Sequence, residues 1–144
     1  MARVVAVCTS QKKGTKKTDI GRALLKENYG IEKDGHADSG SHRQVSLLSQ
    51  SSIDKMKKLG LDVKPGDFAE NITVSGMDVF KLPLNSLISI GEEVVLEITQ
   101  IGKECHDRCA IFKQVGTCIM PVEGVFTRVI KGGFVNRDDV VVRI

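Results

Sequence analysis

The chain has 144 residues, 41% of them hydrophobic and 27% charged, which fits one globular domain with a core of ordinary size. Its formal net charge is only +3, and this small basic excess argues against a nucleic-acid-binding protein. No stretch approaches the roughly 20 apolar residues of a membrane span, and the apolar run near the N-terminus is too short for a signal peptide. We therefore expect a single domain over residues 1–144, located in the cytoplasm, where its four cysteines stay reduced.

Most of the predicted elements are short strands. A Val-rich run over Arg3–Thr9 predicts a buried strand, whereas Ile20–Ile31 has both helical spacing and strand-like residues, and its structure stays open. A short helical turn is predicted over Ala110–Val115. Further strands are predicted over Gln44–Leu48, Ile72–Val74, Leu87–Ile90, Val94–Ile101, Val125–Ile130 and Val140–Ile144.

One regular helix is predicted over Ser51–Leu59. Ser51 and Asp54 have the spacing of a capping box at its N-terminus, with Asp in place of the usual Glu. Gly60 is a typical residue to end the helix. The apolar stripe of this helix would consist of Ile53, Met56 and Leu59.

Turn-forming residues precede several strands, as in Gly66-Asp67-Phe68, Gly91-Glu92-Glu93 and Arg137-Asp138-Asp139. Many short strands separated by such corners are typical of a small, closed or nearly closed barrel. The predicted fold class is therefore mostly β, a small barrel with a few short helices. The core of this barrel is expected to contain Val4, Val7, Leu96, Ile98, Val129 and Val141.

Three of the four cysteines, Cys105, Cys109 and Cys118, fall within fourteen positions, and His106 lies among them. Nearby cations lower the pKa of a thiol, and thiolate is the form that attacks sulfur or binds a soft metal. Arg108 is one such cation in this segment. The cluster therefore predicts a reactive or cofactor-binding thiol.

Two other interpretations of the cysteines stay open. Some are small buried hydrophobes, above all Cys8, which lies in the predicted apolar strand. Alternatively, Cys105, Cys109, Cys118 and a histidine would bind zinc, although structural zinc sites usually contain two tightly spaced cysteine pairs and this chain has no second pair.

Four blocks of this sequence, in order, resemble the MOSC domain, the domain named for the C-terminal part of molybdenum-cofactor sulfurase. The resemblance is closest to the short, stand-alone bacterial members and extends over nearly the whole chain. The matching segments are Lys13-Gly14 with Lys16-Lys17, then Gly30–Leu48, then Gly66–Gly76, and finally Leu96–Val129 with its cysteines. Two departures are visible: Lys33-Asp34-Gly35-His36 replaces the usual Gly-Asp-x-His, and Leu84-Asn85-Ser86 replaces a turn in which glycine is expected.

The resemblance implies a β-barrel and a functional cysteine. In this family that cysteine is proposed to carry sulfur as a persulfide, received from a cysteine desulfurase, which is a pyridoxal phosphate enzyme. In other members it ligates molybdenum in a bound pterin cofactor. The implied partners are thus a cysteine desulfurase or enzymes that make or use the molybdenum cofactor, together with the pterin itself. Cys105 is the first candidate for this cysteine, and for the molybdenum ligand, and Cys109 is the second.

The resemblance also implies a set of site residues. The catalytic set is Cys105, His106 and Cys109, and the cofactor-binding set is Lys13, Lys17, His36, Arg43, Glu70, Asn71 and Arg128. Several members have a second interpretation. The lysines would then belong to a solvated loop, the histidines to the surface or to structural hydrogen bonds, and Glu70-Asn71 to a strand-opening turn. Arg128, within an apolar strand, is equally compatible with an interior or a surface position.

Three functional hypotheses follow. The leading one is a MOSC-type protein that handles sulfur or molybdenum cofactor, with catalysis left open. The others are a module that stores or passes on intact cofactor and a zinc-stabilised interaction domain.

Overall fold

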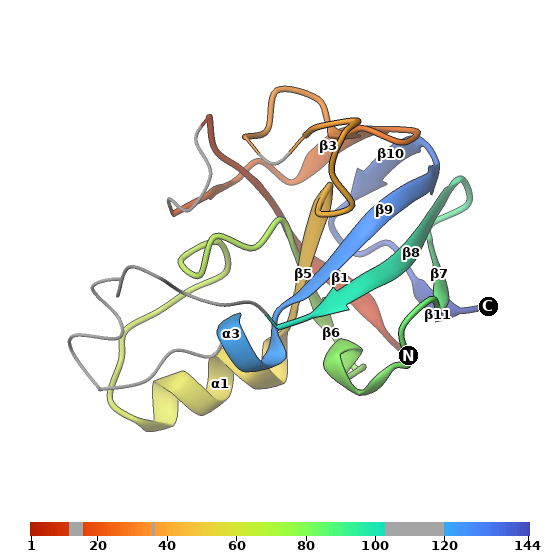
Figure 1. The fold of residues 1–144 in the computed structure, drawn as a ribbon. Coiled ribbons are helices and arrows are strands. Elements are labelled where there is room, and N and C mark those ends of the chain that lie inside the picture. Colours follow the sequence, from red (N-terminus) through yellow and green to blue (C-terminus); the bar gives the residue numbers. More distant parts are fainter. Residues whose placement is uncertain (12–15, 36, 103–119) are drawn as a thin grey trace.

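The computed structural model describes residues 1–11, 16–35, 37–102 and 120–144 (Figure 1). Strands dominate this part of the chain, which confirms the predicted mostly β class. Its helical elements are α1 (Gln50–Lys58), the 3-10 turn η1 (Val79–Lys81) and α3 (Met120–Glu123). The strands are β1 (Arg3–Thr9), β2 (Thr18–Asp19), β3 (Arg22–Lys26), β4 (Gly30–Ile31), β5 (Val45–Ser49), β6 (Ile72–Ser75), β7 (Leu87–Ile90), β8 (Val94–Ile101), β9 (Val125–Lys131), β10 (Gly133–Asn136) and β11 (Val141–Arg143).

Eight strands form one curled sheet in the order β11-β7-β8-β9-β5-β6-β1-β2. Neighbours are antiparallel except β5 and β6, which are parallel. Backbone bonds also connect β1 with the segment that enters β11. Val141 N donates to Ala2 O at 2.9 Å, and Val4 N donates to Asp139 O at 2.9 Å. The sheet therefore curls back on itself into the nearly closed barrel that the sequence predicts (Figure 1).

A second sheet of three antiparallel strands, in the order β10-β3-β4, covers one end of the barrel (Figure 1). It resolves the open segment Ile20–Ile31, which forms the strands β3 and β4. In β3 the buried Ala23 and Leu25 alternate with the exposed Arg22 and Lys26, the period of a half-buried strand. The strand β10 was not predicted from the sequence, because Gly132-Gly133 suggested only a loop.

The main core lies inside the curled sheet. All six residues predicted for it are buried, and none of their side chains exceeds 2% exposure. A second apolar cluster joins α1 to the sheet through the chain that follows the helix. Its members are Leu48, Ile53, Met56, Leu61, Val63, Phe68 and Phe126. The cysteine described by the structure, Cys8, is buried in β1, as predicted for a small hydrophobe.

The predicted helix exists, and its C-terminus agrees with the prediction, because Leu59 is the C-cap and Gly60 follows it with φ +96°. Its N-terminus differs from the prediction. The N-cap is Ser49 rather than Ser51, and no side chain caps it. Ser49 Oγ instead donates to Met77 O at 2.9 Å, while Ser51 Oγ donates to Asp78 Oδ1 at 2.7 Å. The capping box is therefore wrong, because both serines bond to the chain around residue 78. Leu59 is 55% exposed, so the apolar stripe ends before it.

Both departures from the family pattern occur at left-handed backbone positions. Lys33 has φ +67° and Asn85 has φ +69°. Glycine adopts this conformation without strain, whereas a residue with a Cβ atom adopts it at a cost. At both positions the backbone thus keeps the left-handed geometry that the family pattern assigns to glycine. At position 85 asparagine replaces glycine at little cost, because asparagine tolerates the left-handed region.

Replacing Lys33 with glycine is expected to stabilise the protein by up to about 1 kcal/mol, since it removes a left-handed side chain. Lys26→Gly is the matched control, because Lys26 is an exposed lysine in the strand β3, where glycine weakens pairing. Chemical denaturation of the three proteins measures both effects. Equal destabilisation by the two substitutions would contradict the assignment of strain to Lys33.

Candidate functional site

The predicted site residues fall into two groups. Five lie outside the described residues, namely Lys13, His36, Cys105, His106 and Cys109, and their roles stay predictions. The other five are described, namely Lys17, Arg43, Glu70, Asn71 and Arg128. Of these, Lys17, Glu70 and Asn71 gather around the buried Cys8, Arg43 lies near the end of β8, and Arg128 lies on the barrel surface.

Asn71 joins three strands through its side chain. Its Oδ1 accepts hydrogen bonds from Ser46 N at 2.9 Å and from Ser46 Oγ at 3.1 Å, and its Nδ2 donates to Cys8 O at 3.1 Å. The asparagine has no exposed surface. It therefore connects β1, β5 and the start of β6. Both polar atoms of its side chain, Oδ1 and Nδ2, make hydrogen bonds within the fold.

Glu70 is a fully buried carboxyl group at the end of the loop that leads into β6. Its Oε2 accepts from Thr73 Oγ1 at 2.9 Å, and its Oε1 accepts from Phe68 N at 3.3 Å. Burial, which disfavours the charged form, raises the pKa of Glu70 to about 7, although hydrogen bonds to the carboxylate oppose this shift. Glu70 is thus a group that exchanges a proton near neutral pH inside the protein.

Lys17 forms a buried ion pair with Asp34. Its Nζ lies 2.8 Å from Asp34 Oδ1 and donates a second bond to Ser10 Oγ at 3.0 Å. Both charged side chains have 0% exposure. The Lys17 ammonium is therefore directed into the protein, and the alternative of a lysine in a solvated loop does not apply to this residue.

Cys8 lies next to these groups. Burial, and secondarily the charge of Glu70, raise the pKa of its thiol to about 12. A thiol with such a pKa holds its proton at neutral pH, and it is neither a nucleophile nor a metal ligand in that state.

Arg43 is exposed, and its position is fixed by neighbouring residues. Its Nε donates to Gln100 Oε1 at 3.0 Å, and its guanidinium lies 5.2 Å from the centre of the Phe126 ring. The following residue, Gln44, is fully buried and anchors this segment, because its Oε1 accepts from Val129 N at 3.0 Å. The terminal nitrogens of Arg43 have no partner among the described residues, so they present N–H donors of the kind that bind anions.

Arg128 occupies a surface position. Its Nη2 lies 2.7 Å from Glu97 Oε1, across the paired strands β8 and β9. Of the interior and the surface position that the sequence allows for Arg128, the structure therefore shows the surface position. Because the guanidinium is neutralised there, Arg128 is a weaker candidate than Arg43 for an anionic ligand.

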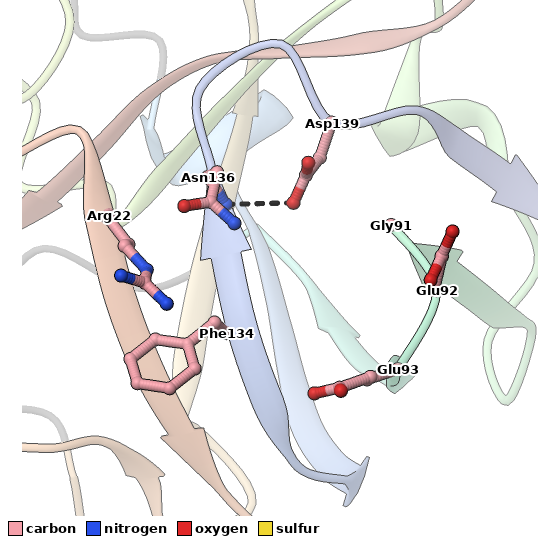
Figure 2. A pocket seen from close by; sticks show the side chains of 7 residues that line it. All are labelled: Arg22, Gly91, Glu92, Glu93, Phe134, Asn136 and Asp139. Carbon is pink, nitrogen blue, oxygen red and sulfur yellow. Dashed lines mark hydrogen bonds between the residues drawn. The ribbon is translucent and has the colours of Figure 1, made fainter.

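A pocket of about 340 Å³ lies elsewhere on the barrel, between β10 and the turn joining β7 to β8 (Figure 2). None of the predicted site residues lines it. Glu92, Glu93 and Asp139 bring three carboxylates to its wall, and the guanidinium of Arg22 stacks on Phe134 at 4.0 Å from the ring centre. So much negative charge makes this pocket unsuitable for an anionic phosphorylated cofactor.

Asp34 belongs to the site region but was not predicted as a site residue from the sequence. It recognised Asp34 as part of a family block, but nothing in the local pattern pairs it with a lysine seventeen residues earlier. Ser10 and Ser46, which complete the two buried hydrogen-bond groups, were missed for the same reason.

The MOSC domain family model matches residues 34–142. The chain belongs to the MOSC domain family. The matched range includes Asp34, Arg43, Glu70 and Asn71 as well as the cysteine block. A search of curated proteins finds no match for this chain.

Solved structures show the same MOSC-type fold. The YuaD protein from Bacillus subtilis superimposes with a TM-score of 0.79 at 17% identity, covering 98% of this chain and 94% of that one. YiiM from Geobacillus stearothermophilus has a TM-score of 0.72 at 16% identity and covers 100% of this chain and 75% of its own. YiiM from Escherichia coli has a TM-score of 0.64 at 18% identity, with coverages of 99% and 69%. At these identities the likeness concerns the fold.

The described residues show neither a metal-binding cluster nor a membrane-spanning helix. Within residues 1–11, 16–35, 37–102 and 120–144, no cluster of three or more His, Cys, Asp or Glu side chains is arranged to hold a metal ion. Cys105, Cys109 and Cys118, the cysteines of the zinc hypothesis, lie outside these ranges. In the same part of the MOSC domain, no helix is both long and apolar enough to cross a bilayer.

Proposed function

We propose that this MOSC domain handles sulfur or molybdenum cofactor, with Cys105 as the persulfide-bearing or molybdenum-binding residue. The observation that carries the proposal is the family match over residues 34–142, since this range contains the cysteine block and four of the predicted cofactor-binding residues that the structure describes. A cytoplasmic location, with a cysteine desulfurase or enzymes of the molybdenum cofactor as partners, belongs to the same proposal.

Some of the described residues meet the needs of an anionic pterin cofactor, and others do not. Such a cofactor requires N–H donors for its phosphate and a soft thiolate for its metal. The guanidinium of Arg43 has terminal N–H donors with no partner among the described residues, whereas Lys17 and Arg128 are paired with carboxylates. Of these three residues, Arg43 therefore fits the phosphate, and Cys105 is the proposed metal ligand.

The roles of the chain's own residues differ between the two branches of the proposal. As a persulfide carrier, the Cys105 thiolate would attack the terminal sulfur of a persulfide on a desulfurase cysteine. A new S–S bond to Cys105 would form, the S–S bond of the desulfurase persulfide would break, and the desulfurase cysteine would leave as a thiolate. In the cofactor branch, a bound molybdenum centre would supply redox chemistry. Arg43 would then orient the phosphate, and Glu70, bonded to Thr73 and Phe68, would hold a proton near neutral pH inside the fold.

Loading of cysteine variants tests the proposal. Cys105→Ser is expected to fold with a melting temperature close to that of the parent and to lose at least about 90% of bound sulfane sulfur or molybdenum, because serine keeps the size of the side chain but provides no thiolate. Sulfane sulfur is measured by cyanolysis and molybdenum by mass spectrometry of the metal, in protein purified from a bacterium that makes the cofactor.

Two companion variants make the result specific. Cys109→Ser tests the second candidate, and Cys8→Ser is the control for a buried cysteine. Full loading of Cys105→Ser together with loss in Cys109→Ser would transfer the role to Cys109. A large fall in the melting temperature of Cys105→Ser, reproduced by a chelator in the parent, would instead support the zinc hypothesis.

A further inference from the structure

Four segments of the chain meet at the Lys17–Asp34 ion pair, and backbone hydrogen bonds connect them there. Asp34 Oδ1 also accepts from Ser10 N at 3.0 Å, and Gly35 N donates to Ser10 O at 2.8 Å. On the other side, Lys17 N donates to Gly66 O at 2.8 Å. The pair thus lies between the end of β1, the start of β2, the chain after β4 and the loop before β6.

The packing at this point leaves little freedom. A Cβ atom on Gly66 would overlap the carbonyl oxygen of Lys17 and would lie 3.2 Å from Cys8 Sγ. Gly66 also has φ +94°, a conformation that favours glycine. The loop before β6 is therefore fitted closely against the Lys17 backbone, and the Lys17 side chain, together with Ser10 N, holds the Asp34 carboxylate.

Stability alone does not explain a buried ion pair. Removing two charges from water is costly, and a pair of apolar side chains of similar volume is often as stable or more stable. Directional bonds from one ammonium to a carboxylate and a hydroxyl do, however, fix the relative positions of the segments more narrowly than apolar packing does. The segments fixed here carry predicted site residues: the chain after Asp34 continues to Arg43, and the loop after Gly66 continues to Glu70 and Asn71.

We propose that Lys17 and Asp34 are positioning residues for the proposed phosphate site at Arg43, and that their buried ion pair holds the segment leading to Arg43 against the loop leading to Glu70. This inference rests on the proposed function. It assigns Lys17 an indirect role, in place of the expected direct contact with a cofactor phosphate. Lys17 acts through the geometry of other residues, since its ammonium is already bound by Asp34 and Ser10.

Hydrogen exchange measured by NMR tests the positioning role without any ligand. In the double variant Lys17→Met/Asp34→Leu, the amides of residues 17 and 35 are expected to exchange about tenfold faster or more, because their backbone partners, Gly66 and Ser10, are no longer held in place. Amides of β7 and β8 should exchange at the parent's rate. The control is Lys16→Met, which changes the neighbouring exposed lysine. Parental exchange at residues 17 and 35 in a folded double variant would overturn the proposal.

Molybdenum content distinguishes positioning from direct binding. It is measured per folded protein after purification from a bacterium that makes the cofactor. Positioning predicts at least about a fivefold loss in Lys17→Met, in Asp34→Asn and in the double variant, at a temperature where all are folded. If Lys17 bound the cofactor directly, Asp34→Asn would release its ammonium from the carboxylate and favour binding. Retained or increased molybdenum in Asp34→Asn would therefore overturn the proposal. If the parent binds no molybdenum, the cofactor branch of the proposed function fails, whereas the exchange rates still decide the role of the pair.

Discussion

Replacing Asn71 with alanine is expected to lower the free energy of unfolding by about 3–5 kcal/mol, the range for losing several buried hydrogen bonds at once. The substitution leaves the amide of Ser46 and the carbonyl of Cys8 without their side-chain partner, and both residues are buried. Because these groups are buried, the cost includes their desolvation. The parallel contact between β5 and β6 is expected to be weakened first.

Chemical denaturation followed by circular dichroism measures this loss. Asn136→Ala is the matched control, because Asn136 is partly buried and its carboxamide makes no hydrogen bond with the described residues. The control should change the unfolding free energy by no more than about 0.5 kcal/mol. If both variants lose the same small amount, Asn71 does not have the structural role assigned to it, and its side chain is free for a ligand.

Replacing Glu70 with glutamine is expected to remove much of the fall in stability between pH 5 and pH 8. The pKa of Glu70 in the folded protein is about 7, above its ordinary value of 4.5. Below pH 4.5 the group is protonated in both states, and its contribution to stability is fully present. As the pH rises from 4.5 to 7, the unfolded chain releases the proton first, so stability falls, and the loss is complete above 7. At 1.36 kcal/mol for each pKa unit between 4.5 and about 7, the parent loses about 3 kcal/mol of unfolding free energy from this group.

The difference between the parent and Glu70→Gln isolates this group, because every other titrating residue is common to both proteins. Unfolding free energies at pH 5, 6, 7 and 8 provide the curve, and pH 5 is the internal reference, where glutamine replaces an almost neutral carboxyl group. Direct titration of the Glu70 side-chain carbon by NMR provides an independent midpoint. Parallel stability curves for the two proteins would show that Glu70 ionises in the folded state as readily as in the unfolded chain.

The strands with strong local patterns were predicted closely. The bounds of β8 agree with the predicted Val94–Ile101, because Leu96 and Ile98 alternate with Glu97 and Thr99 and one face of the strand is buried. Patterns that depend on distant residues were not predicted. Ser51 is at a capping-box spacing, yet its hydroxyl bonds to Asp78, and β10 becomes a strand only by pairing with β3.

The candidate site shows the same limit. Residue types and the family resemblance were sufficient to select Lys17, Glu70 and Asn71, and the structure places all three in one buried region. Their local sequence could not indicate their roles. A lysine in a basic loop is usually solvated, and only the tertiary fold brings Asp34 to within 2.8 Å of this one. Likewise, Arg128 has apolar neighbours in sequence, but β9 directs it to the surface toward Glu97.

The central claim, that this MOSC domain carries sulfur or molybdenum cofactor, is tested most directly by native mass spectrometry of the protein purified from a bacterium that makes the cofactor. The account predicts a mass above that of the bare chain by whole numbers of sulfur atoms or by one molybdenum pterin cofactor, and predicts that the addition disappears in Cys105→Ser. A parent whose only species is the bare chain, or whose only addition is a zinc ion, would contradict it.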